Sequence, residues 1–287
     1  MPAIRPFFDP DTATVTYLVW DEATRKAAII DPVLDFNPNS GAVTDASANT
    51  VLKAVDDLDL DLEWVLETHA HADHMTAGDL IRKQTGAKIG IGAHITKVQS
   101  VFKDMFEAED VAPDGSVFDA LFEDGAEFSI GETPVRVLHT PGHTPACITY
   151  VIGDAAFVGD TLFMPDFGTA RTDFPGGDAA TIFRSIHRIL ELPAETRIFV
   201  GHDYPPEGRL APAWETTVAE ERRANIHVHE GVTEADYVAM REARDATLDA
   251  PRLLLPSLQV NIRAGALPPA VPSGKRFLKL PVRSDLE

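Results

Sequence analysis

The sequence predicts a layered α/β fold in which helices cover the outer faces of paired sheets. Apolar segments rich in β-branched residues form a hairpin pair at Thr14–Trp20 and Lys26–Asp31. Other segments carry apolar residues at helical spacing, as in Ser47–Leu58 and Ala179–Leu190. Hairpins interleaved with amphipathic helices favour stacked sheets with helices outside them.

The first half of the chain opens with that hairpin, whose strands are joined by a polar turn at residues 21–25. Asn37–Asp45 is rich in Asn, Pro, Ser and Gly, and we expect it to form a loop. The other elements expected here are, in order, a helix at Ser47–Leu58, a strand at Leu62–Glu67, a helix at Thr76–Lys83, a strand at Ala87–Ile91, a helix at His94–Phe106 and an acidic surface excursion at Asp104–Asp124.

The second half continues the alternation of short strands and helices. The elements expected are strands at Glu127–Ser129 and Pro134–Leu138, a hairpin of Ile148–Ile152 and Ala155–Val158, a helix at Ala179–Leu190 and a strand at Arg197–Val200. From about Ala213 the pattern becomes helical and charged, and Leu254–Ile262 is predicted as a last extended segment.

Length and charge limit the classes of function. With 287 residues the chain can bury a large core, as one large domain or one domain with an appendage. Its net charge of −20 argues against nucleic acid as a partner, because the protein would repel phosphate. For the same reason, an anionic substrate requires a local basic patch on this protein.

Hydropathy and cysteine content bear on location. We expect no membrane span, because no stretch of about eighteen apolar residues occurs. Residues 1–6 lack the apolar core of a secretory signal. The single cysteine, Cys147, excludes an intramolecular disulfide and fits a reducing, cytoplasmic setting.

A cassette of metal-ligating side chains occupies residues 68–74, Thr-His-Ala-His-Ala-Asp-His. It follows the strand-like segment at Leu62–Glu67 and precedes a helix-like segment, so it lies in a loop that can aim several side chains at one point. The ligand-type residues are His69, His71, Asp73 and His74. Imidazole and carboxylate are ligands shared by divalent Zn, Fe and Mn, so the cassette predicts a metal site.

Further ligand-type residues follow strand-like segments elsewhere in the chain: His143, Asp160 and His202. Each comes directly after a glycine, which lets the backbone turn sharply and leaves space beside a ligand. One such residue alone would be unremarkable. Their equivalent positions, together with the cassette, indicate one convergent site.

These motifs resemble those of the metallo-β-lactamase superfamily over roughly residues 14–204. The likeness consists of the cassette, Thr140–Thr144 (TPGHT), Gly159–Asp160 and Gly201–Tyr204 (GHDY). It implies a metallo-β-lactamase αββα sandwich, with the metal site at the edge of the two sheets. We assign residues 1–212 to this domain, and residues 213–287 to a C-terminal helical extension packed on it.

Within the superfamily the sequence is most similar to the persulfide dioxygenases, also called sulfur dioxygenases. The segments that carry this likeness are Cys147–Tyr150, Ala170–Phe174, Val218–Asn225 and Asn261–Gly265. The resemblance implies an oxidoreductase that uses O2 to convert glutathione persulfide to sulfite and glutathione. It also implies a homodimer.

The resemblance allows two arrangements of metal. Superfamily hydrolases use two zinc ions, and all the residues that would bind them are present: His69, His71 and His143 at one site, Asp73, His74 and His202 at the other, and Asp160 as a bridge. Persulfide dioxygenases instead bind one Fe(II), through His69, His143 and Asp160. This triad leaves three coordination positions open for dioxygen and the persulfide sulfur. Zinc has no redox chemistry, so a zinc form would only hydrolyse.

With a single iron, the other ligand-type residues need another role. We expect His71, Asp73, His74 and His202 to orient the ligands and bound water through hydrogen bonds. Glutathione carries carboxylates, so a cationic or polar patch is expected near the metal. The resemblance assigns this patch to Arg171, Tyr204, Arg222, Asn261 and Arg263.

Other functions fit the same motifs. One is a dinuclear zinc hydrolase of glutathione thioesters, similar to glyoxalase II. Another is a non-catalytic persulfide or metal sensor, which would not need the complete ligand set.

Three further residues are not expected to take part in the chemistry. Cys147 lacks an evident base and is expected to pack near the metal. His227 and His229 lie in a charged region and are expected to be solvated.

Overall fold

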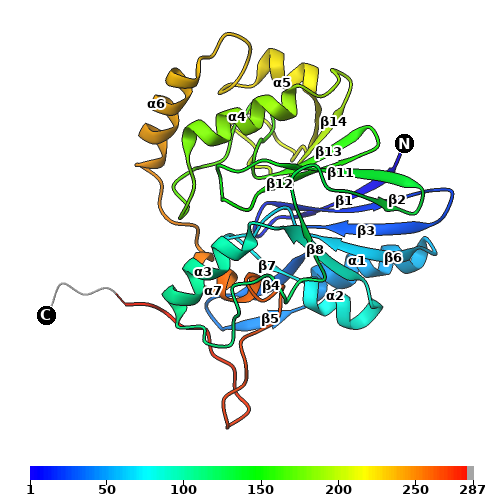
Figure 1. Ribbon diagram of the computed structural model, residues 1–287, viewed down its shortest axis with the longest axis vertical. Coiled ribbons are helices and arrows are strands. Elements are labelled where there is room, and N and C mark those ends of the chain that lie inside the picture. Colours follow the sequence, from blue (N-terminus) through cyan, green and yellow to red (C-terminus); the bar gives the residue numbers. More distant parts are fainter. Residues whose placement is uncertain (283–287) are drawn as a thin grey trace, which may run out of the picture.

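Two sheets packed face to face form the centre of the structure (Figure 1). The structure, a computed structural model, describes residues 1–282. The first sheet has six strands in the order β1 (Ala3–Asp9), β2 (Thr14–Trp20), β3 (Lys26–Ile30), β6 (Asp61–Leu66), β8 (Lys88–Gly92) and β9 (Ala120–Phe122). The second has six in the order β10 (Glu127–Ile130), β11 (Thr133–His139), β12 (Ile148–Ile152), β13 (Ala155–Gly159), β14 (Arg197–Val200) and β15 (Glu215–Thr217).

Helices cover the outer face of each sheet (Figure 1). Beside the first sheet lie α1 (Ala46–Asp57), α2 (Gly78–Thr85), α3 (Ile95–Phe106) and α7 (Leu254–Asn261). Beside the second lie α4 (Ala179–Leu190), α5 (Val218–Ala224) and α6 (Glu234–Asp245). A small sheet of β5 (Ala42–Thr44), β4 (Val33–Asn37) and β7 (Met75–Thr76) completes the first half. The predicted αββα sandwich is confirmed.

Strand β2 shows how the sequence produces these layers. Val15, Tyr17 and Val19 belong to the core between the sheets, whereas Leu18 belongs to the core beneath the helices. Successive side chains of a strand point to opposite faces, and both faces are covered here. Every residue of β2 except the last is therefore buried, and the strand is apolar on both sides.

Two buried tyrosines connect the sheets across the central core. The hydroxyl of Tyr17 in β2 donates to the carbonyl of Val200 in β14 at 2.6 Å, and that of Tyr150 in β12 donates to the carbonyl of Glu67, just after β6, at 3.0 Å. Burial raises the pKa of both hydroxyls well above the ordinary value, so they remain donors. Each accepting carbonyl lies two residues before a candidate metal ligand, so these bonds fix the strand ends that carry the site.

Most of the predicted elements are confirmed, but the extended segment at Leu254–Ile262 is wrong. This segment forms helix α7, and its Leu258 is fully buried against the first sheet's helix layer. Pro256 is tolerated because it lies in the first turn, where a backbone N–H has no partner within the helix.

Two predicted surface segments also contribute to the fold. Residues 42–44 of the expected loop form β5, which pairs with β4. In the expected surface excursion, Val111 and Phe118 are buried and residues 120–122 form β9, parallel to β8. Scattered apolar residues among acidic ones give no periodic signal, which is why these elements were not predicted. Strands β1, β4, β7 and β15 were not predicted either.

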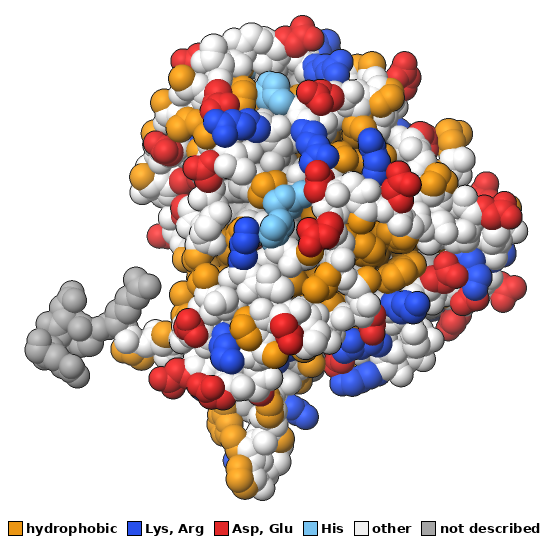
Figure 2. Space-filling model, viewed as in Figure 1, with side chains coloured by type: hydrophobic (Ala, Val, Ile, Leu, Met, Phe, Trp, Pro, Cys, Tyr) orange, Lys and Arg blue, Asp and Glu red, His pale blue; other side chains and the backbone are white. Residues whose placement is uncertain are grey.

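Acidic and basic side chains are interspersed over the face shown in Figure 2, without a broad basic area. The segment that protrudes at the bottom of this view carries hydrophobic side chains. None of the helices within residues 1–282 is both long and apolar enough to cross a membrane.

We expect Tyr150→Phe to lower the free energy of unfolding by about 1–3 kcal/mol, because it leaves the buried Glu67 carbonyl without this donor. Urea denaturation followed by circular dichroism measures the change. An unfolding free energy equal to that of the wild type would show that the bond between the sheets contributes no stability.

Candidate metal centre

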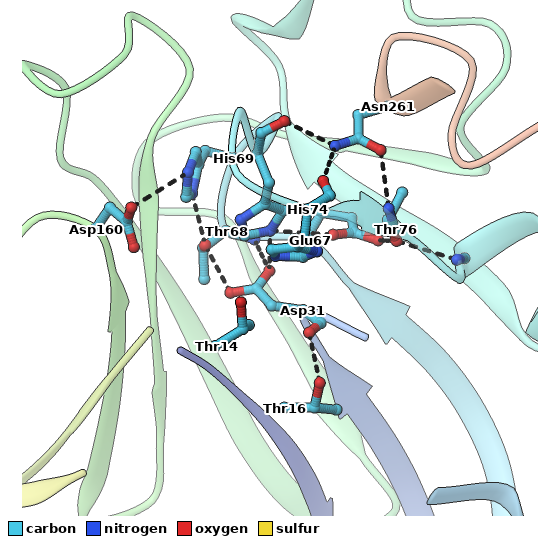
Figure 3. Close-up of polar contacts among 12 residues, drawn as sticks. Thr14, Thr16, Asp31, Glu67, Thr68, His69, His74, Thr76, Asp160 and Asn261 are labelled. Carbon is cyan, nitrogen blue, oxygen red and sulfur yellow. Dashed lines mark hydrogen bonds and ion pairs between the residues drawn. The ribbon is translucent and has the colours of Figure 1, made fainter. Parts of the chain in front are cut away.

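Loops at one edge of the sandwich bring together all the ligand-type residues predicted from the sequence. The cassette follows β6, His143 follows β11, Asp160 follows β13 and His202 follows β14. Apart from Asp73, which is partly exposed, these side chains are buried. Figure 3 shows several of them within one network of polar contacts.

His69, His143 and Asp160 form a triad whose ligand atoms face one another. The Nε2 atoms of His69 and His143 lie 3.9 and 3.8 Å from Oδ2 of Asp160. The three ligand atoms all lie within 4.8 Å of one another. Nε2 of His69 is buried and has no hydrogen-bond partner within residues 1–282. A buried nitrogen left unsatisfied between an imidazole and a carboxylate fits a divalent cation.

Hydrogen bonds at the other ring nitrogens orient both imidazoles of the triad. Nδ1 of His143 lies 2.8 Å from the carbonyl of Arg171, which can only accept. Nδ1 of His69 lies 3.0 Å from the hydroxyl of Thr68, which itself donates to Asp31 at 2.7 Å. Both Nδ1 atoms therefore carry the proton, and both Nε2 atoms offer a lone pair. Burial lowers the pKa of His69 well below its ordinary value, which favours this neutral form.

The buried carboxylate of Asp31 accepts hydrogen bonds from the cassette (Figure 3). Its Oδ1 accepts from the backbone N–H of Thr68 at 2.7 Å and from Nε2 of His71 at 3.0 Å. Burial would lower the pKa of His71, but Asp31 and then Glu67 raise it to about 10. Nε2 of His71 is therefore held by these two carboxylates, with Glu67 at 3.4 Å, while its Nδ1 is buried without a partner in the described part of the chain.

His202 bridges two carboxylates. Its Nδ1 lies 2.6 Å from Oδ1 of Asp160 and its Nε2 lies 2.5 Å from Oδ2 of Asp73. Burial opposes protonation, but Asp160 and Asp73 outweigh it and raise the pKa of His202 well above the ordinary value. Both ring nitrogens are thus used by carboxylates, and Asp160 keeps Oδ2 for the triad.

A second group of ligand atoms, from His71, Asp73 and His74, also lies within 4.8 Å of one another. Nε2 of His74 is buried without a hydrogen-bond partner in the described part of the chain, and its Nδ1 lies 3.1 Å from the Met75 carbonyl. Burial lowers the pKa of His74 to about 4. Nδ1 of His71 is likewise buried without a partner within residues 1–282, whereas Oδ2 of Asp73 is already paired with His202.

Asn261 of α7, near the C-terminal end of the chain, forms hydrogen bonds with the backbone of the cassette (Figure 3). Its Nδ2 donates to the carbonyls of His71 and His74, both at 2.8 Å, and its Oδ1 accepts from the N–H of Thr76 at 2.9 Å. The side chain is buried, so it contacts the backbone of the metal loop rather than a ligand in the cavity. The family resemblance predicts that Asn261 contacts substrate. In the structure Asn261 instead positions the backbone of the metal loop.

A cavity of about 380 Å³ opens beside the triad. It contains Arg171 and Tyr204, two of the residues expected to contact substrate. Its other lining residues are Asp11, Thr12, Ala72, Asp73, His143, Asp160, Phe163, Phe167, Thr169, Ala170, Arg241, Arg244, Leu248, Pro251 and Arg252. An apolar wall with a few polar groups and a metal triad at one end is typical of a small-molecule site.

Arg222 and Arg263, also expected to contact substrate, do not line this cavity. The guanidinium of Arg222 donates to the carbonyl of Leu190, and that of Arg263 pairs with Asp110 at 2.7 Å. These contacts connect helices and loops of the fold. The arrangement therefore brings Arg171 and Tyr204 to the site and leaves the other predicted substrate contacts elsewhere.

Two residues outside the ligand set test other expectations. Cys147 is buried beside Thr144, and burial raises its pKa to about 12, so it packs as a thiol. His227 is not fully solvated as expected: it is half-buried, and its Nδ1 accepts from the backbone N–H of Thr169 at 3.1 Å.

Sequence reasoning missed Asp31, although the signal used for Asp160 applies to it as well. Asp31 is a carboxylate directly after a strand, β3, and its φ of +49° turns the chain into the loop. It also missed Arg241, Arg244 and Arg252, because their positions depend on how the C-terminal segment packs against the sandwich.

The family profile described as the metallo-beta-lactamase superfamily matches residues 9–202. The chain belongs to the metallo-beta-lactamase superfamily. The match spans β2 to His202 and so includes every residue of the triad and of the cassette. The chain is therefore an enzyme of this superfamily with its metal-binding residues in place.

Among curated relatives, a probable metallo-hydrolase of Burkholderia pseudomallei is 51% identical and aligns over 97% of this chain and 98% of its own length. Glyoxylase B2 of Dictyostelium discoideum is 46% identical over 97% of this chain and 96% of its own length. Human persulfide dioxygenase ETHE1 is 33% identical over 77% and 74%. The chain spans 65% of the length of the beta-lactamase hydrolase-like proteins of Xylella fastidiosa and Agrobacterium fabrum.

Among solved structures, the crystal structure of ETHE1 from Myxococcus xanthus is similar to this chain with a TM-score of 0.74 and 34% identity. The alignment covers 92% of this chain and all (100%) of that chain. A likeness of this extent agrees with the αββα architecture.

We expect Asp160→Ala to lose bound metal, because it removes the carboxylate that both imidazoles of the triad face. Asp73→Ala is the matched control, since Asp73 lies outside the triad but also pairs with His202. Elemental analysis of proteins purified side by side gives the metal content per chain. Full occupancy in Asp160→Ala, or equal loss in both variants, would contradict the assignment of the triad.

We expect Asn261→Ala to weaken metal binding about 10–100-fold, as is common when a partner that orients a metal site is removed. Gln259→Ala is the control, because Gln259 lies on the same helix but bonds to Lys279 and not to the cassette. Competition with a chelator measures the affinity. Equal affinity in folded Asn261→Ala and wild type would show that α7 does not position the loop.

Proposed function

We propose that the protein is a persulfide dioxygenase that oxidises glutathione persulfide with O2 at one Fe(II) bound by His69, His143 and Asp160. The observation that carries this proposal is the distribution of free ligand atoms. The triad presents its Nε2 atoms and a carboxylate oxygen toward one point, whereas both ring nitrogens of His202 are engaged by carboxylates. One complete ligand set supports one metal.

A two-His, one-carboxylate site supplies Fe(II) with open coordination positions and redox chemistry, which zinc lacks. The protein's own contribution is orientation: the Arg171 carbonyl and Thr68 fix the two imidazoles, and His202 holds Oδ1 of Asp160. The balanced reaction consumes one O2 and one water per persulfide, and it releases sulfite, glutathione and two protons.

The cavity supports a substrate of the size and chemistry of glutathione persulfide. Phe163, Phe167 and Tyr204 provide an aromatic wall beside the triad, and the Tyr204 ring stacks on His202 with centroids 5.9 Å apart. Four arginines line the same cavity, Arg171, Arg241, Arg244 and Arg252. The 33% identity to human persulfide dioxygenase ETHE1 agrees with this choice of substrate.

A second candidate is a dinuclear zinc hydrolase of glutathione thioesters. The group of His71, Asp73 and His74 supports it, since these residues lie close enough to hold another metal ion. The names of two relatives, a probable metallo-hydrolase and Glyoxylase B2, also favour it. Against it, both ring nitrogens of His202 are engaged by carboxylates, so His202 would first have to leave Asp73 or Asp160.

One experiment separates the two functions. Protein purified without oxygen is analysed for iron and zinc per chain, and oxygen uptake is followed with glutathione persulfide, with S-lactoylglutathione hydrolysis measured in parallel. We expect one iron per chain, oxygen uptake and sulfite formation. Two zinc ions with thioester hydrolysis and no oxygen uptake would replace the first proposal by the second. Metal without either activity would favour a binding protein.

A further inference from the structure

The cavity beside the triad is lined by both metal-ligating residues and arginines. The ligand-type residues are Asp73, His143 and Asp160, and an apolar wall of Phe163, Phe167, Leu248 and Pro251 lies along the cavity. The remaining charged residues are Arg171, Arg241, Arg244, Arg252 and one carboxylate, Asp11. Outside the ligand-type residues, basic side chains thus outnumber acidic ones in this lining, in a chain whose net charge is −20.

Two of these arginines are already neutralised within the protein. Arg171 forms a two-point contact with the carboxylate of Asp173 at 2.6 Å and donates to the carbonyl of Asp249. Arg241 is buried, pairs with Asp245 at 2.6 Å and donates to the carbonyl of Thr169. Their charges are satisfied, so neither is free to bind a substrate carboxylate in this arrangement.

The other two arginines have no such partner. Arg244 lies in the last turn of α6, and Arg252 lies just before α7. Both are exposed, and neither guanidinium forms an ion pair or hydrogen bond with any residue of the described part of the chain. A free guanidinium presents several donors in a fork that matches a carboxylate.

We propose that Arg244 and Arg252 form a carboxylate-binding site that selects small persulfides whose carbon chain ends in carboxylate groups. The persulfide end is placed at the triad, so this inference rests on the proposed function. The apolar wall of Phe163 and Phe167 contacts the body of the ligand between its two ends. The volume of about 380 Å³ fits a small ligand, since such sites span roughly 300–1,000 Å³.

This assignment makes Arg244 and Arg252, rather than Arg171, the residues that recognise substrate charge. Both come from the C-terminal segment, beyond the part of the chain that matches the superfamily profile. Substrate selection is therefore separate in sequence from the metal site. Hydrosulfide or a persulfide without carboxylates would be a poor substrate, because it leaves both guanidinium groups without a partner.

The test compares Arg244→Gln, Arg252→Gln and the double variant with Arg136→Gln. Arg136 is an exposed arginine on β11 that lies outside this cavity, so its replacement makes the same change in net charge. The readouts are kcat and KM for glutathione persulfide and for the persulfide of glutathione diethyl ester. Binding of glutathione itself is measured by calorimetry at low and high salt, and thermal unfolding is followed for every variant.

We expect each single variant to raise KM for glutathione persulfide about tenfold with kcat changed less than about twofold, which corresponds to losing roughly one charged contact. The diethyl ester should bind wild type and variants equally, and Arg136→Gln should match wild type. Glutathione binding should weaken in parallel with KM and with added salt.

Unchanged KM and unchanged glutathione binding in the double variant would overturn the site. Lower thermal stability without a change in KM would also overturn it, and would assign Arg244 to stabilising the end of α6. If no protein consumes oxygen but glutathione binding falls in the Arg244 and Arg252 variants, the carboxylate site stands and the proposed dioxygenase function fails.

Discussion

The buried carboxylate of Asp31 is the contact on which the metal loop depends. A charge in the interior is tolerated only when it is fully hydrogen-bonded, and Asp31 meets this condition through Thr68 and His71 of the cassette. The same Thr68 hydroxyl determines which nitrogen of His69 faces the metal. One carboxylate at the end of β3 thus sets the path of the loop and the protonation of its first ligand.

Contacts between the two sheets keep the ligand-bearing loops in position relative to one another. Tyr17 and Tyr150 each reach from one sheet to a strand-end carbonyl of the other, directly before ligand-bearing loops. The sheets contribute different members of the triad, His69 from the first and His143 with Asp160 from the second. Small relative movements of the sheets would separate these ligand atoms, so the stability of the central core and the geometry of the site are linked.

The fold and the ligand set were predictable because their signals are local. Strands β6, β11, β13 and β14 are short, and the ligand-type residues follow these strands. The division of roles within the ligand set was not predictable in the same way. Whether His202 offers a nitrogen to a metal depends on carboxylates 42 and 129 residues away in sequence. The helix at residues 254–261 was missed because its run of apolar residues is compatible with a strand as well as with a helix. Its proline lies in the first turn, where a helix tolerates one.

The contact between Asn261 and the cassette can form only late during synthesis of the chain. The carbonyls it binds are 187 and 190 residues earlier in the chain. Every ligand-type residue up to His202 emerges from the ribosome before this side chain does, because synthesis runs from the N-terminus. The metal loop therefore exists first without its C-terminal restraint and acquires it only when the last helix docks. The last restraint on the metal loop therefore comes from a segment that contributes no ligand.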